Sequence, residues 1–175
     1  MGFNALPKRK VIKGISFVLD AFGCYKPENL ECLPARIRIR IRKPADCLPL
    51  FENVRNRRQE CFVALTLDGV NQVIKSHEIT VGLANQCQVH PRETYARAVE
   101  DRAVGLIIAH NHPSGSLDPS TDDLVTTRRL ADAGRLMGIT LYDHIIVAET
   151  GWISLRERFP DYFQRGALDG TDKYS

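Results

Sequence analysis

One short stretch of this 175-residue chain, an apolar run that ends in two histidines, places the strongest constraint on its fold. The run Val104–Ala109 has the composition of a buried strand. It is followed by His110 and His112, with Asn111 between them. Because alternate side chains of an extended segment point to the same side, we expect the two imidazoles to share one face of that strand.

The next residues predict a tight turn and then a helix. Pro113–Gly115 has the composition of a turn, and Pro119–Asp123 is typical of a helix start with acidic residues in its first turn. Two imidazoles at a strand end that face a carboxylate on the following helix form a metal-ligand arrangement. Zinc takes imidazole nitrogen and carboxylate oxygen at roughly 2 Å, and its catalytic sites use three protein ligands and keep one position for water. The alternative is a His-x-His pair on polar surface, with Ser120 or Asp123 capping the helix without a metal.

The JAMM (MPN+) zinc metalloprotease motif is His-x-His-Pro, a spacer and then Ser-x-x-Asp. It resembles the pattern formed here by His110, His112, Pro113, Ser120 and Asp123. The longer string His-Asn-His-Pro-Ser-Gly is similar to the RadC branch of that family. Further strings that resemble RadC sequences are Gln59–Val63, His90–Glu93 and Asp143–Val147. The resemblance covers about residues 44 to 155, so the chain looks like a RadC-like JAB domain nearly on its own.

This resemblance implies the JAB/MPN fold, a cytidine-deaminase-like three-layer α/β architecture with a mixed sheet covered by helices. It also implies a Zn2+ cofactor held by His110, His112 and Asp123, and a metal-activated water that attacks a peptide or isopeptide bond. In JAMM enzymes the general base is a Glu from a strand upstream of the His-x-His segment, and Glu78 is the position that resembles it. Ser120 would stabilise the developing oxyanion, as the motif Ser does in the family.

Each assignment has a plainer alternative. Glu78 can be an exposed residue of its strand, and Ser120 can be an ordinary N-cap, a role that is hard to combine with oxyanion binding. Asp122 is the neighbour most easily confused with the ligand, but the motif spacing falls on Asp123, which leaves Asp122 facing solvent. We expect His144, which lies in an apolar strand, to be a hydrogen-bonded core residue or a partner of a ligand.

Cysteine usage and missing motifs argue against several other classes. The five cysteines are odd in number and form no Cys-x-x-Cys pair, unlike a disulfide framework, a cysteine zinc knuckle or a zinc nucleobase deaminase. His-Glu-x-x-His is also absent, so the chain is not a helix-borne zincin. No apolar run approaches the roughly 20 residues that span a bilayer, and the first residues lack the pattern of a signal peptide. We therefore expect a cytoplasmic protein with reduced thiols and no membrane association.

The net charge of +3 is unevenly distributed, with +8 on residues 1–58 and −5 on residues 59–175. This asymmetry hints at an acidic partner, such as nucleic acid, for the basic third. The cluster Lys8–Lys13 is either a solvated arm or a phosphate-contacting tail. Arginine and isoleucine alternate over residues 35–42, which predicts a half-buried strand. Its solvent-exposed face would carry Arg36, Arg38, Arg40 and Arg42. These arginines either line a nucleic-acid groove or keep an edge strand from pairing with another molecule.

The remaining pattern predicts the order strand, strand, helix, strand, helix, strand, strand, and hence helices that cover a mixed sheet. We expect strands at 60–67, 71–81, 104–112, 139–148 and 152–155, and helices at 44–54 (despite Pro49), 91–102, 120–137 and 156–163. Val99 and Leu136 are among the helical residues expected to face the core. The predicted domains are a basic N-terminal extension at 1–43, a RadC-like JAB/MPN domain at 44–165 and a polar tail at 166–175.

Two functions follow from the sequence. The first is a zinc-dependent metallohydrolase of the metallopeptidase or isopeptidase type. Its substrate would be a peptide or an isopeptide-linked protein. The second is a RadC-type DNA-repair or nucleic-acid-associated accessory protein whose metal site is not catalytic.

Overall fold

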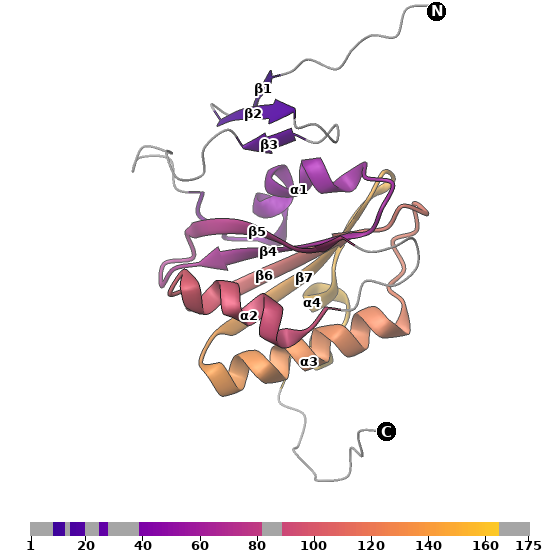
Figure 1. Ribbon diagram of the computed structural model, residues 1–175. Coiled ribbons are helices and arrows are strands. Elements are labelled where there is room, and N and C mark those ends of the chain that lie inside the picture. Colours follow the sequence, from indigo (N-terminus) through magenta and orange to yellow (C-terminus); the bar gives the residue numbers. More distant parts are fainter. Residues whose placement is uncertain (1–8, 13–14, 20–24, 28–38, 82–88, 165–175) are drawn as a thin grey trace, which may run out of the picture.

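The computed structural model describes residues 9–12, 15–19, 25–27, 39–81 and 89–164. Its centre is a mixed five-stranded sheet with the strand order β5-β4-β6-β7-β8 (Figure 1). The strands are β4 (Cys61–Leu67), β5 (Val73–Val81), β6 (Gly105–Asn111), β7 (Thr140–Ala148) and β8 (Gly151–Ser154). The helices are η1 (Pro44–Cys47), α1 (Leu48–Arg55), α2 (Pro91–Glu100), α3 (Thr121–Met137), α4 (Leu155–Arg158) and η2 (Pro160–Tyr162), of which η1 and η2 are 3-10 helices.

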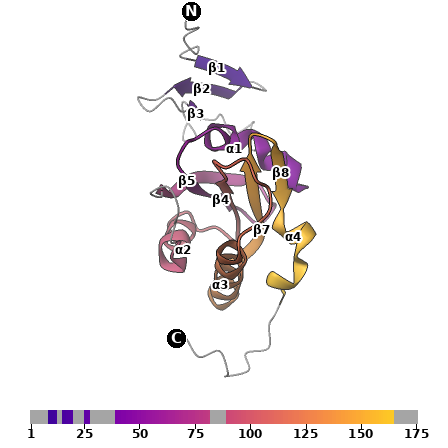
Figure 2. The same ribbon diagram turned by 90° about the vertical axis from the view of Figure 1, so that its right-hand side faces the viewer.

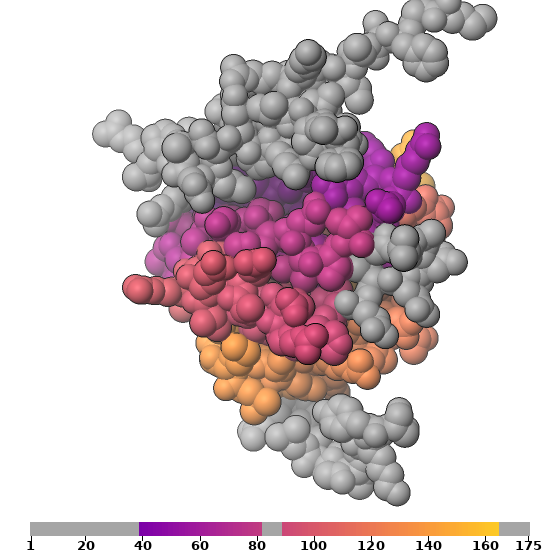
Figure 3. Space-filling view, viewed as in Figure 1, coloured from indigo at the N-terminus to yellow at the C-terminus, as the bar shows by residue number. Residues whose placement is uncertain are grey.

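The inner strands β4 and β6 are buried along their whole length, whereas the edge strand β5 is partly exposed at the surface next to α2 (Figure 3). A hairpin joins β4 to β5, and the Asp68 carboxylate stabilises its turn by accepting from the backbone N–H groups of Val70 and Gln72. β4 is also antiparallel to β6, whereas β6 and β7 are parallel and are linked through α3, as a crossover requires. The antiparallel pairing brings the start of β4 to the end of β6, where Phe62 lies opposite His110.

The sheet is covered on both faces, which gives three layers (Figure 2). Because side chains alternate along a strand, neighbouring residues of β4 enter different clusters: Val63 packs towards α1, and Phe62 packs towards α2 and α3. The α1 side is filled mainly by Phe51, Val54, Val63, Leu65, Ile107, Ile145 and Val147. The other side is filled mainly by Phe62, Tyr95, Ala98, Leu106, Ile108, Leu130 and Leu141.

The predicted α/β class and the predicted order of elements are correct. Pro49 does not break its helix because it lies in the first turn of α1, where a missing N–H interrupts no helical hydrogen bond. The expectation that Val99 and Leu136 face the core is wrong, since both are exposed. The buried stripe of α3 ends at Gly134, and Leu136 lies two positions further on, about 200° around the helix axis. Leu136 is accordingly 85% exposed.

The N-terminal part contains an antiparallel sheet of β1 (Arg9–Ile12), β2 (Ile15–Leu19) and β3 (Tyr25–Pro27), which lies beside α1 in Figure 1. Residues 9–12 thus form a strand, and contact of this basic cluster with phosphate stays a prediction. Of the strand predicted over 35–42, the structure describes residues 39–42, where Arg40 forms an isolated bridge with Gln72 at the outer edge of β5. Its alternation holds, since Ile41 is buried and Arg40 and Arg42 are exposed.

Some predictions fall outside the described residues. These include the positions of Arg36 and Arg38 and of the tail at 166–175. None of the helices that the structure describes is long and apolar enough to cross a lipid bilayer.

Candidate metal centre

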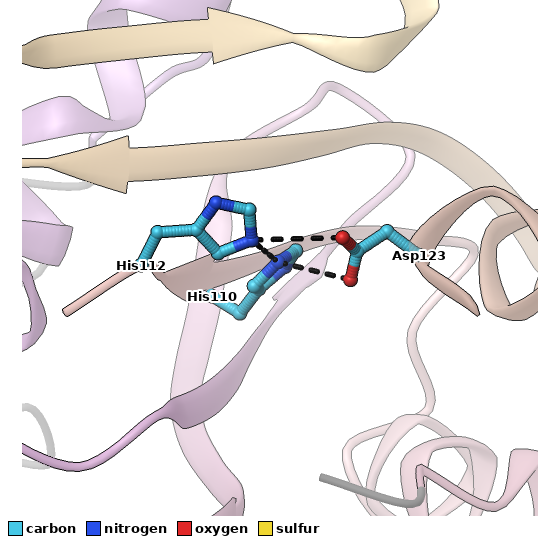
Figure 4. Close-up of side chains that lie close together, drawn as sticks. All are labelled: His110, His112 and Asp123. Carbon is cyan, nitrogen blue, oxygen red and sulfur yellow. Dashed lines mark hydrogen bonds and ion pairs between the residues drawn. The ribbon is translucent and has the colours of Figure 1, made fainter. Parts of the chain in front are cut away.

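Three side chains that can act as metal ligands converge where β6 ends and α3 begins (Figure 4). His110 is the last residue but one of β6, His112 follows the strand, and Asp123 lies in the first turn of α3. The Nε2 atoms of the two histidines are 2.9 Å apart. Asp123 Oδ1 lies 3.1 Å from His110 Nε2, and Asp123 Oδ2 lies 3.5 Å from His112 Nε2. Within the described ranges this is the one group of three His, Cys, Asp or Glu residues whose ligand atoms lie within 4.8 Å of one another.

The turn after β6 orients the ring of His112. Gly115 adopts a left-handed conformation, with φ of 81°, and its N–H donates to the carbonyl of His112. This folds the chain back so that the carbonyl of Ser116 accepts a hydrogen bond from His112 Nδ1 at 2.9 Å. A neutral imidazole that donates from Nδ1 keeps an unprotonated Nε2, and this atom is the one that faces His110 and Asp123.

A capping box at the start of α3 holds the Asp123 carboxylate. Ser120 is the N-cap, and its Oγ accepts from the Asp123 N–H at 3.1 Å. In return, Asp123 Oδ2 accepts from the Ser120 N–H at 2.7 Å and from the Ser120 hydroxyl at 2.6 Å. Oδ2 is therefore engaged by the cap, while Oδ1 remains directed at His110. Asp122 is exposed, as the motif spacing predicts.

The electrostatics of this group favour a bound cation. Burial alone would raise the pKa of the Asp123 carboxyl, but hydrogen bonds with His110, His112 and Ser120 outweigh it and hold the pKa well below its usual range. The hydrogen bond with Asp123 in turn raises the pKa of His112 against the opposing effect of burial. An ionised carboxylate is thus held between two imidazole nitrogens, the donor types that zinc prefers.

Glu78 does not lie beside this group, so the geometry gives no support to the prediction that it is the general base. Glu78 pairs across the sheet with Val63, which in turn pairs with Ala109. Paired residues share a face, so Glu78 is on the α1 side of the sheet, whereas His110 is on the α3 side. The Glu78 carboxylate instead forms an ion pair with Arg57 at 2.7 Å, and its side chain is 40% exposed.

Glu60 is the carboxylate that approaches the three ligands without joining them. It directly precedes β4, and its Oε1 lies 4.0 Å from His110 Nε2. Its side chain is 24% exposed, which leaves it a path to solvent. Sequence reasoning missed Glu60 because its position depends on the pairing of β4 with β6, two strands that are distant in the sequence. The available signal was its location at the start of a strand that could run antiparallel to β6.

Asn111, between the two histidines, fixes the backbone on both sides of Glu60. Its Oδ1 accepts from the N–H of Cys61 at 2.8 Å. Its Nδ2 donates to the carbonyls of Arg57 and Gln59 at 3.0 and 3.2 Å. Successive residues of a strand point to opposite faces, so the Asn111 side chain lies on the other face from those of His110 and His112. Asn111 can therefore bond the backbone at the start of β4 while the two histidines face Asp123.

The fold and the site together define a JAB-type α/β domain with a candidate metal centre at the end of its third core strand in chain order, β6. The family model described as the RadC-like JAB domain matches residues 41–159. The chain belongs to that family, as the sequence resemblance predicted.

The chain is also similar to several curated proteins that carry the name UPF0758 protein. It is 43% identical over 137 residues to one from Methanospirillum hungatei, a match that covers 77% of this chain and 61% of the relative. It is 44% identical over 122 residues to one from Clostridium perfringens, with 69% and 54% covered. A third, from Pelobacter propionicus, is 41% identical over 154 residues, with 87% and 64% covered. The chain thus spans between 54% and 64% of the length of these relatives.

Proposed function

We propose that this chain is a zinc-dependent hydrolase that cleaves peptide or isopeptide bonds, with His110, His112 and Asp123 as ligands and Glu60 as general base. One observation carries the proposal: two imidazole nitrogens and a carboxylate oxygen converge, and a second carboxylate stands 4.0 Å from one of them without belonging to the group. Membership of the JAB family, which includes metalloproteases, supports the same reading.

The donor set fits zinc. Both histidines present Nε2 and Asp123 presents a carboxylate oxygen, and three protein ligands are the number that catalytic zinc sites use. Zinc at such a site supplies Lewis acidity, which lowers the pKa of water and polarises a carbonyl.

Glu60 has the properties that proton transfer requires. It lies outside the three-ligand group, so its carboxylate is free to take a proton from water and deliver it to the leaving amine. Its partial exposure gives substrate and water access to its oxygens. The three backbone bonds of Asn111 hold the chain before and after it, which limits how far the carboxylate can drift from His110.

Ser120 supports the site through Asp123 in the first instance. Its hydroxyl hydrogen is directed at Asp123 Oδ2, so it would have to leave that bond to stabilise an oxyanion. Ser120→Ala separates the two roles. Loss of the cap alone should lower stability by about 1 kcal/mol, whereas loss of an oxyanion donor should reduce kcat by about 10²–10³.

The experiment compares Glu60→Gln with the matched variant Glu78→Gln. Zinc-loaded proteins are assayed on a library of internally quenched peptides and isopeptide-linked peptide pairs, and zinc content is measured in parallel. We expect Glu60→Gln to lose about 10²–10⁴ in rate with its zinc retained. Glu78→Gln should keep both its hydrolysis rate and its zinc, because the partner of Glu78 is Arg57. His110→Ala should lose zinc. Hydrolysis that survives Glu60→Gln but not Glu78→Gln, or a wild-type protein that cleaves nothing in the library, would contradict the proposal.

A second candidate function, nucleic-acid binding, has one observation in its favour. Arg40 and Arg42, which flank the buried Ile41, are both exposed, and they belong to the basic segment of the sequence at residues 1–58. Affinity for duplex DNA that falls with salt, and whose salt slope decreases by about 2 in an Arg40→Ala/Arg42→Ala double variant, would support direct phosphate contacts. Zinc content should be unchanged in that variant.

A further inference from the structure

We infer that Thr127 and His144 form a hydrogen-bond relay that sets the tautomer of His110 and thereby aims its Nε2 lone pair at the metal position. The inference rests on the proposed metal site. It adds two positioning residues, one on α3 and one on β7, that do not themselves contact the ion.

The relay consists of three hydrogen bonds in series. The Thr127 hydroxyl donates to the backbone carbonyl of Asp123 at 2.7 Å. The same hydroxyl lies 2.6 Å from His144 Nδ1, and His144 Nε2 lies 2.8 Å from His110 Nδ1. Thr127 and His144 are fully buried, and His110 is nearly so. The ring of Phe62 covers the relay, stacked on His110 and edge-on to His144.

The direction of each bond follows from counting protons. A threonine hydroxyl has one hydrogen, and a carbonyl can only accept, so the Thr127 hydrogen points to Asp123. His144 Nδ1 must then donate to Thr127, which leaves a neutral His144 with an unprotonated Nε2. That atom accepts from His110 Nδ1, so a neutral His110 has the lone pair of its Nε2 available for a ligand bond. His144 is neutral in this scheme because it is buried and, in the described part of the chain, no carboxylate contacts either of its nitrogens.

The two histidine ligands are therefore aimed by different means. His112 donates from Nδ1 directly to the carbonyl of Ser116 in the loop. His110 lies inside the sheet, and its Nδ1 reaches a backbone carbonyl only through His144 and Thr127. That carbonyl belongs to Asp123, so the relay also ties the orientation of one ligand to the backbone of another.

Thr127→Val tests the relay with little change in volume. Without the hydroxyl, His144 Nδ1 has no acceptor, and the proton should move to Nε2. His144 would then donate to His110 Nδ1 and drive the His110 proton onto the metal-facing nitrogen. We expect the zinc dissociation constant of Thr127→Val, measured by chelator competition, to rise at least tenfold. Thr127→Ser, which keeps the hydroxyl, should restore wild-type affinity.

Thr94→Val is the matched control for the substitution itself. Thr94 is also fully buried, but its hydroxyl has no hydrogen-bond partner among the described residues. The zinc affinity of Thr94→Val should equal that of the wild type. Equal affinities for Thr127→Val, Thr127→Ser and Thr94→Val would overturn the relay.

Long-range ¹H–¹⁵N spectra of histidine-labelled protein give a readout that needs neither activity nor a variant. The relay requires His144 to carry its proton on Nδ1 in the wild-type protein, with or without zinc, and a proton on Nε2 would refute it. This measurement decides the matter if Thr127→Val fails to fold. A wild-type protein that binds no zinc would defeat the proposed function, while the His144 tautomer would still test the relay.

Discussion

Asn111 links the end of β6 to the start of β4, and we expect Asn111→Ala to destabilise the protein by roughly 4 kcal/mol. The substitution removes one bond to a backbone N–H and two to backbone carbonyls. The N–H belongs to Cys61, which is fully buried, and leaving it bare costs about 1–3 kcal/mol. The carbonyls of Arg57 and Gln59 lie nearer the surface, so water can replace part of each bond and each loss costs about 0.5–1.5 kcal/mol.

Urea-induced unfolding followed by circular dichroism measures this change directly. Asn53→Ala on α1 is the matched control because the buried Oδ1 of Asn53 has no hydrogen-bond partner within the described residues. Removing that oxygen and gaining helix propensity should leave stability unchanged or raise it slightly. The reasoning fails if Asn111→Ala costs less than about 1 kcal/mol, the net value of a single ordinary hydrogen bond. It also fails if the two alanine variants behave alike.

Three further predictions concern residues away from the ligands. Gly134→Ala should cost about 1–3 kcal/mol in urea unfolding, because an added Cβ would meet the hydroxyl of Tyr95 and a backbone carbonyl; an unchanged midpoint would contradict this packing. Burial raises the pKa of the Cys47 thiol to about 12, so mass spectrometry should find it unmodified by iodoacetamide at pH 8 until the protein unfolds. Burial alone would raise the pKa of the Asp101 carboxyl, but hydrogen bonds with His77 and Thr66 outweigh it and hold that pKa below its usual value. The stabilising effect of the Asp101 carboxylate is therefore present above the unfolded pKa and is lost as pH falls through the folded pKa. The stability of Asp101→Asn should thus differ most from that of the wild type at pH 6, and the difference should shrink only as pH falls below about 4.

The clustering of His110, His112 and Asp123 could be predicted from the sequence because each part of its geometry is local. The alternation of a strand places His110 and His112 on one face, and the helix start after the turn places Asp123 a short distance along the chain. The turn at Gly115, which the sequence also predicts, folds the connection back towards the end of β6. The same locality explains why the order of strands and helices was predicted correctly.

The sequence could not show which carboxylate lies beside His110, because strand pairing is not local. Glu60 and Glu78 both belong to the β4–β5 hairpin region upstream of His110, and the family resemblance was assigned to Glu78. The choice depends on two facts that only the folded sheet supplies: β4 runs antiparallel to β6, and a residue opposite Val63 faces α1. A comparable difficulty affected Leu136, since the buried stripe of α3 includes Thr127 and Gly134, residues that a hydrophobic pattern undervalues.

Asp123 shows how closely the fold and the site depend on one another. Its carboxylate completes the capping box of α3 through Oδ2 and faces His110 through Oδ1, so the same side chain ends the loop and offers a ligand atom. Because the cap is made by Ser120 within the protein, the carboxylate is ordered before any ion arrives, and little side-chain entropy remains to be lost on binding. A shift in where α3 begins would move the cap and the ligand together. The hydrogen bonds that start this helix therefore also determine where a cation can be held.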